Sequence, residues 1–103
     1  MNIFANLPDN LKEEFFEDII KKDSLKIERI ISKGHTTQQD WYDQVDDEWV
    51  IVLKGEAILS FENSEDVRLR EGDYINILAH TKHRVSWTKP EIETIWLAIH
   101  YPK

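Results

Sequence analysis

Residues 48–56, Glu-Trp-Val-Ile-Val-Leu-Lys-Gly-Glu, contain an apolar run, a glycine and the start of a second run. β-Branched and aromatic residues favour strands, and a glycine between two such runs favours a turn. Residues 72–83, Gly-Asp-Tyr-Ile-Asn-Ile-Leu-Ala-His-Thr-Lys-His, repeat this order and end on a histidine. They predict a turn, a short strand over 74–77 and a loop that leads to His83. Both stretches indicate an all-β fold.

Short runs of the same kind continue on both sides of these two stretches. Turn residues separate them, which is typical of a β-sandwich or β-barrel. Residues 35–47 are polar, and they are expected to form a loop or an irregular edge strand. Further strands are predicted at 25–32, 56–62, 67–70, 83–87 and 92–101.

The first 23 residues have a different pattern. Leu11, Phe15 and Ile19 recur at helical spacing, and Asn10 with Glu13 resembles a capping box. We therefore predict one domain over residues 1–103, with an N-terminal helical segment at 1–23 and a β-barrel at 24–103.

Length and composition limit the classes of function. A chain of 103 residues suffices for one core but not for two. Its 20 acidic and 13 basic residues give a formal charge of −7, which argues against binding to a nucleic acid backbone. The absence of cysteine excludes disulfides and thiolate sites. No apolar run is long enough to span a membrane, so the protein is expected to be cytoplasmic.

Strand alternation places two ionisable side chains on apolar faces. Glu48 shares a face with two valines, and His83 shares one with Val85 and Trp87, so both are expected to point inward. A buried carboxylate has to be paired, protonated or bound to a metal, and a Glu48–His83 hydrogen bond is one such solution. The opposite face of residues 48–53 is also apolar. We expect the N-terminal helix or a second subunit of a homodimer to cover it.

The two stretches resemble the two motifs of the cupin superfamily over residues 25–101. Glu48 and Gly55 match the first motif, and Gly72 and His83 match the second. The resemblance implies a double-stranded β-helix, or jelly-roll, barrel. This chain differs from the two motifs at four positions. Tyr42 and Gln44 replace the first-motif histidines, and Leu78 and His80 replace the proline and inner glycine of the second motif.

In the family, the matching glutamate and histidine usually hold a metal. The resemblance therefore implies a divalent ion (Mn, Fe, Ni or Zn) held by Gln44, Glu48 and His83, although a neutral amide is a weaker ligand than imidazole. Without an ion, Glu48, His83 and Tyr42 form an acid–base cluster or anchor a ligand. Of the other histidines, His35 and His80 are expected at the surface. His100 is expected either in the barrel or at an edge or interface.

These observations leave two kinds of function open. One is a cupin that binds a small polar ligand and acts as a metal-dependent enzyme. The alternative is a non-catalytic ligand-binding or structural cupin with a degenerate, metal-free site. The residues do not decide whether the protein is an enzyme, because one fold hosts many chemistries.

Overall fold

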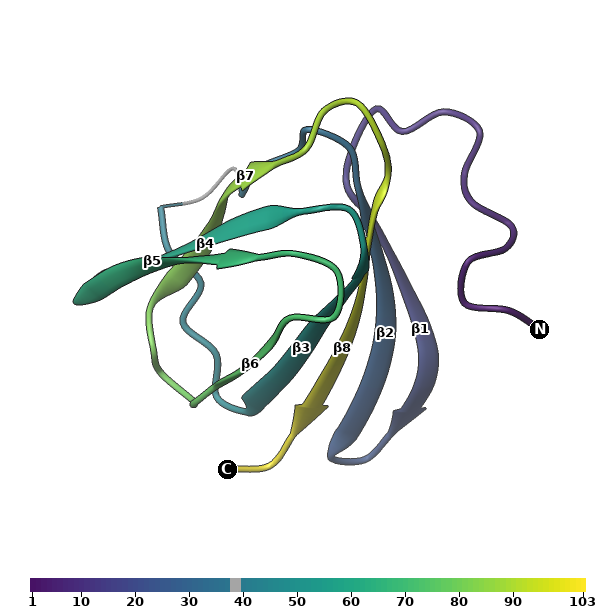
Figure 1. The fold of residues 1–103 in the computed structure, drawn as a ribbon. Coiled ribbons are helices and arrows are strands. Elements are labelled where there is room, and N and C mark those ends of the chain that lie inside the picture. The colour runs from purple at the N-terminus through teal and green to yellow at the C-terminus, as the bar shows by residue number, and fades with distance from the viewer. Residues whose placement is uncertain (38–39) are drawn as a thin grey trace.

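The computed structural model describes residues 1–37 and 40–103, and these form eight strands and no helix (Figure 1). The all-β prediction is confirmed. The strands are β1 (Phe15–Lys22), β2 (Leu25–Ser32), β3 (Asp47–Lys54), β4 (Ala57–Phe61), β5 (Ser64–Leu69), β6 (Tyr74–Ile77), β7 (His83–Thr88) and β8 (Thr94–Tyr101).

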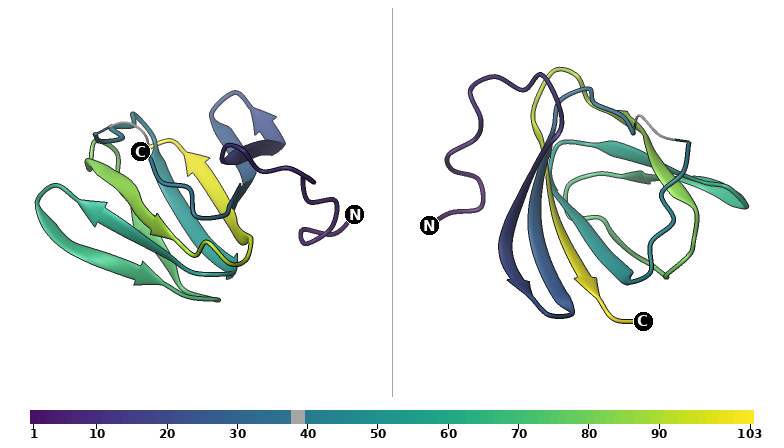
Figure 2. Two further views of the ribbon diagram at one scale, coloured as in Figure 1. Left: turned by 90° about the horizontal axis from the view of Figure 1, so that it is seen from above. Right: turned by 180° about the vertical axis from the view of Figure 1, so that it is seen from behind.

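The strands form two antiparallel sheets that enclose the core. The larger sheet has the order β1-β2-β8-β3-β6, and the smaller has the order β5-β4-β7 (Figures 1 and 2). Apolar residues of both sheets meet between them. The buried core consists of Ile30, Val50, Val52, Ala57, Leu59, Leu69, Ile77, Trp96 and Ala98.

The predicted strands agree closely with the observed ones. Strands 25–32 and 74–77 have the predicted bounds, and the others differ by a few residues at their ends. The predicted loop at 35–47 includes residues 38–39, which lie outside the described part of the chain. In the described part of that loop, Tyr42 forms an isolated bridge with His83.

The predicted N-terminal helix is wrong. Residues 15–22 instead form β1, which pairs with β2 across the turn at Asp23 and Ser24. The spacing of Leu11, Phe15 and Ile19 fits a helix, but β1 gains a backbone partner that a helix would not have. Phe16 pairs with Ile30, and a bulge after Asp18 changes the register. Tertiary pairing therefore overrides the local pattern.

The segment before β1 is attached to the outside of β2 by Arg29. This arginine points away from the core, yet it is only 4% exposed. Its guanidinium donates hydrogen bonds to the carbonyls of Ile3, Ala5 and Asn6, at 2.6 to 3.3 Å. Its Nε lies 2.9 Å from Glu17 of β1. Both faces of β2 are consequently covered, which explains why its residues from Glu28 to Ser32 are all buried.

The outer face of β3 has no helix over it. Trp49, Ile51 and Leu53 are half-buried there, and the Trp49 ring lies 5.5 Å from the ring of exposed Tyr74. The expected helical cover is therefore wrong. The described ranges also contain no helix that is long and apolar enough to cross a bilayer.

Candidate functional site

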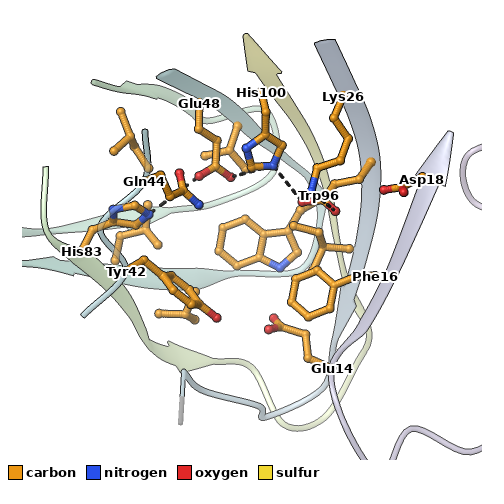
Figure 3. Close-up of a pocket in the computed structure, with 16 residues that line it drawn as sticks. Glu14, Phe16, Asp18, Lys26, Tyr42, Gln44, Glu48, His83, Trp96 and His100 are labelled. Atoms are coloured by element: carbon orange, nitrogen blue, oxygen red, sulfur yellow. Dashed lines mark hydrogen bonds and ion pairs between the residues drawn. The ribbon is translucent and has the colours of Figure 1, made fainter. Parts of the chain in front are cut away.

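An open cavity of about 470 Å³ lies between the two sheets. Its base is apolar. Its walls carry ionisable side chains from five strands, from the segment before β1 and from the segment between β2 and β3 (Figure 3). The lining consists of Glu14, Phe16, Asp18, Lys26, Glu28, Ile30, Tyr42, Gln44, Glu48, Val50, Leu59, Ile77, His83, Val85, Trp96 and His100.

Glu48 and His83 face this cavity, as strand alternation predicted. They are 8% and 4% exposed, and they lie on β3 and β7, in different sheets. His83 Nε2 is 3.7 Å from Glu48 Oε1, an ion-pair distance rather than a hydrogen bond. On the other side of the ring, His83 Nδ1 lies 2.8 Å from the Thr81 carbonyl. A protonated Nδ1 that donates to this carbonyl fixes the ring with Nε2 toward Glu48.

His100 and Glu28 extend this pair into a chain of four side chains. His100 Nε2 lies 2.8 Å from Glu28 Oε1 and 3.9 Å from Glu48 Oε2. Strand β8 lies between β2 and β3, and His100 is directly opposite Glu48 in the β3–β8 register. Figure 3 shows the resulting order His83–Glu48–His100–Glu28. The sequence left His100 between the barrel and an edge, and it did not single out Glu28, although Glu28 shares strand parity with Ile30.

Neighbouring charges and burial shift the pKa values of His83, His100 and Glu28. Burial lowers the pKa of His83, but the Glu48 carboxylate and the Thr81 carbonyl more than offset this and raise it overall. The hydrogen bond to Glu28 raises the pKa of His100, against a smaller effect of burial. Burial raises the pKa of Glu28, but His100 and Lys26 together lower it below its usual value. Both imidazoles are therefore held more strongly in their protonated form.

We predict that this network makes stability depend on pH. A histidine with a raised pKa in the folded state stabilises fully below its unfolded value of 6.5 and loses that contribution as the pH rises through the folded pKa. Urea unfolding between pH 6 and pH 9 should therefore show falling stability, with a smaller fall in His100→Gln. His80→Gln, at an exposed position, is the control. An equal pH dependence in wild type and His100→Gln would contradict the prediction.

At low pH, the dependence of stability on pH has the opposite sign. Glu28 has a lowered pKa, so its contribution is present above the ordinary value of 4.5 and is lost as the pH falls through the folded pKa. The barrel is therefore expected to be most stable between the range where Glu28 becomes protonated and the range where the two histidines lose their protons.

Tyr42 and Gln44 also line the cavity. Tyr42 and His83 exchange two backbone hydrogen bonds, of 2.7 and 3.2 Å, and their rings lie 5.8 Å apart. Burial raises the pKa of the Tyr42 phenol, so this group is a neutral hydrogen-bonding partner at neutral pH. Figure 3 shows the Gln44 amide beside Glu48 and His83.

Three side chains near the mouth of the cavity stabilise the turn that precedes β7: Asp43, Asp47 and His80. Exposed His80 has a positive φ of 62°, and its Nδ1 lies 2.8 Å from Asp43. Asp47 accepts a hydrogen bond of 2.7 Å from the backbone amide of Ala79. The predicted surface position of His80 is confirmed, whereas His35 is half-buried and its Nδ1 accepts a hydrogen bond from the Lys33 amide.

One expectation from strand alternation is wrong. Trp87 does not share the cavity face of His83, because a bulge interrupts the β4–β7 register between Ile58 and Leu59. Trp87 instead packs beneath the guanidinium of Arg68, 5.7 Å from the ring centre. The tryptophan in the cavity is Trp96, whose Nε1 donates a 3.2 Å hydrogen bond to Ser32.

The donors present make an incomplete metal site. In residues 1–37 and 40–103, no three His, Asp or Glu side chains converge closely enough to hold an ion. The Nε2 of His100 is already engaged by Glu28 at 2.8 Å. An ion would rest on Glu48, His83 and the neutral amide of Gln44, which is a weaker set than the three or four strong donors of ordinary sites.

Comparisons with known proteins agree with this architecture. The family model described as a cupin domain matches residues 28–100. A candidate mannose-6-phosphate isomerase from Ralstonia eutropha JMP134 is 39% identical, with a TM-score of 0.95 over 100% of this chain and 97% of that one. No curated protein matches the chain.

Two more distant solved structures show the same fold. A cupin superfamily protein from Desulfitobacterium hafniense DCB-2 is 16% identical, with a TM-score of 0.78 over 94% of this chain and 84% of that one. An RmlC-like cupin from Methanocaldococcus jannaschii, with a double-stranded β-helix fold, is 16% identical, with a TM-score of 0.73 over 94% and 87% of the two chains.

Proposed function

Because this chain belongs to the cupin domain family, we propose that it binds a small polar molecule in the barrel and exchanges protons with it through His83 and Glu48. The observation that supports this most strongly is the His83–Glu48–His100–Glu28 chain at the wall of the cavity. Two imidazoles, each beside a carboxylate, supply a proton donor and a proton acceptor in one pocket.

The two ends of the His83–Glu48 pair have different roles. His83, whose pKa is raised by the Glu48 carboxylate and the Thr81 carbonyl against the effect of burial, is the proton donor of the pair through Nε2. Glu48 accepts a proton, and His100 lies 3.9 Å from its other oxygen. Such positioned pairs accelerate proton transfer by about 10²- to 10⁴-fold.

The rest of the cavity suits a ligand with a carbon skeleton and polar substituents. Trp96 and the aliphatic base offer an apolar surface, while Tyr42 and Gln44 offer hydrogen bonds. A volume of about 470 Å³ lies in the range of small-molecule sites. The name of the Ralstonia protein, a candidate mannose-6-phosphate isomerase, suggests a reaction class. An aldose–ketose isomerisation moves a proton between a carbonyl carbon and its neighbour, and we propose chemistry of this class here.

Deuterium exchange tests proton transfer whatever the product is. The protein is incubated in D2O with aldoses and ketoses in neutral, amino and phosphorylated forms, and proton NMR follows loss of the hydrogen next to the carbonyl. We expect exchange with at least one sugar, and a loss of about 100-fold in Glu48→Gln and His83→Gln. Ser86→Ala, at an exposed position of β7, is the control. No exchange with any sugar, or exchange unaffected by both variants, would contradict proton transfer.

A metal-dependent reaction is the second candidate. It is favoured by the Thr81 carbonyl beside His83 Nδ1, because ligating histidines usually donate their other nitrogen to such a group. Gln44, Glu48 and His83 would hold the ion, which would supply polarisation of a substrate carbonyl. The same exchange assay separates the candidates. A chelator should leave the ion-free reaction unchanged, whereas loss of exchange together with stoichiometric Mn, Fe, Ni or Zn in untagged protein would assign the metal-dependent one.

A further inference from the structure

The cavity lining carries an excess of negative charge. Four carboxylates face it, from Glu14, Asp18, Glu28 and Glu48, and the only lysine or arginine among the lining residues is Lys26. With both lining histidines protonated, the lining still has one net negative charge, and with both neutral it has three. A dianionic phosphate would therefore enter against the field of the cavity.

Lys26 is not available as a phosphate anchor. Its Nζ lies 3.7 Å from Glu28 Oε2. Glu28 also engages His100, so the cation and the imidazole share one carboxylate. A phosphate group that bound Lys26 would have to break this arrangement and lie beside Glu28. The charges of the walls therefore oppose a phosphorylated sugar even though the cavity has the size for one.

The β1 wall of the cavity carries the carboxylates of Glu14, just before β1, and Asp18, and neither forms an ion pair with His83 or His100. Asp18 forms no hydrogen bond or ion pair with the described residues, and Glu14 accepts a hydrogen bond from the Ser32 hydroxyl. Burial raises the pKa of Glu14, so a nearby cation would stabilise its charged form. Figure 3 shows Glu14, Phe16 and Asp18 on one side of the cavity and His83 with Tyr42 on the opposite side.

Aromatic rings accompany these carboxylates. Phe16 projects from the same strand as Asp18, and Trp96 lines the cavity from the core (Figure 3). The Trp96 ring is held by its hydrogen bond to Ser32, which in turn donates to Glu14. A carboxylate beside the face of an aromatic ring is a favourable environment for an ammonium group.

We propose that the molecule bound in this cavity is a small primary amine, with its ammonium group at Phe16 on the β1 wall, between the flanking carboxylates of Glu14 and Asp18. Its carbon skeleton lies on Trp96 and extends toward His83 and Glu48. This inference rests on the proposed function for the reacting end of the ligand. It adds that the opposite end is cationic, and that the substrate class is an amino sugar or a similar amino-carbonyl compound rather than a sugar phosphate.

A series of sugars with one skeleton and different charges tests this directly. In 6-amino-6-deoxymannose, the 6-amino sugar, the amine is at the end remote from the carbonyl, where mannose 6-phosphate carries its phosphate. This 6-amino sugar, mannose and mannose 6-phosphate are titrated into the protein by calorimetry at low salt. We expect the 6-amino sugar to bind about tenfold more tightly than mannose, and mannose 6-phosphate to bind most weakly. The preference for the 6-amino sugar should decrease as salt is added, because the interaction is electrostatic.

Variants of the β1 wall locate the effect. Glu14→Gln combined with Asp18→Asn should weaken binding of the 6-amino sugar about tenfold and leave mannose binding within about twofold. Asp18→Asn alone, at an exposed position, should show part of the loss without disturbing the fold. Glu65→Gln, on exposed β5 outside the cavity, is the control for net charge.

The outcomes separate this inference from the proposed function. Equal affinity for the three sugars, tighter binding of mannose 6-phosphate, or no effect of the β1 variants on binding of the 6-amino sugar would overturn the amine proposal. Deuterium exchange would still report proton transfer in each of those cases. Conversely, binding of the 6-amino sugar as expected, together with no exchange in any sugar, would support the amine site and contradict catalysis.

Discussion

Replacement of Gly55 by alanine is expected to lower the free energy of unfolding by about 4 kcal/mol. Gly55 follows β3 and has a φ of +91°, a region that residues with a side chain rarely adopt. It also lies against the start of β8. An added Cβ would lie 2.7 Å from the Thr94 Cα and would overlap the Thr94 hydroxyl oxygen. Backbone cannot move aside as a flexible side chain can, so the strand would have to shift.

Gly72 provides a matched control for this variant. Its φ of +89° is almost the same, but nothing lies within 4 Å of an added Cβ. Gly72→Ala therefore bears only the backbone strain, about 1–2 kcal/mol. Urea unfolding of both variants measures the difference. Equal losses in the two variants would mean that the contact with Thr94 does not determine the requirement for glycine at position 55.

Replacement of Arg29 by methionine is expected to destabilise the protein by about 3 kcal/mol, because hydrogen bonds from a charged donor are lost. The guanidinium holds three carbonyls of the first six residues and also contacts Glu17. Methionine keeps much of the volume but donates nothing. The N-terminal segment should detach, so trypsin should cleave after Lys12 much faster than in wild type.

Arg70→Met is the control for loss of an arginine. Arg70 has a side chain that is 69% exposed and an ion pair of 3.7 Å with Glu56. Such a surface pair contributes about 0–1 kcal/mol. Unchanged cleavage after Lys12 in Arg29→Met would show that the N-terminal segment is held by other contacts.

The strands could be predicted from the sequence because their alternation and turns are local. Residues 48–61 contain a buried strand, a turn glycine and a return strand within a short stretch of chain. The helix predicted for the N-terminal segment is wrong because the local pattern is misleading there. Leu11, Phe15 and Ile19 satisfy helical spacing, and only pairing with β2 makes residues 15–22 a strand. Because β1 is an edge strand and largely exposed, its own pattern of burial contains little information.

The candidate site could be predicted only in part. Alternation placed Glu48 and His83 inward, and resemblance to the family added Tyr42 and Gln44. His100 and Glu28 depend on the order β2-β8-β3, which brings together residues 72 positions apart in the chain. Asp18 and Phe16 join the cavity only because β1 is a strand beside β2. The spacing of residues along the chain does not predict such neighbours.

Sequence alone was sufficient for the all-β fold, the cupin family and the inward direction of Glu48 and His83, because strand periodicity and turn glycines act over a few residues. Tertiary structure was required for the partners of these groups: Glu48 lies between two histidines, and the wall opposite His83 is acidic and aromatic. The physical reason is that side-chain proton affinity and ligand charge depend on distances across strands, and only the order and register of the sheets determine those distances.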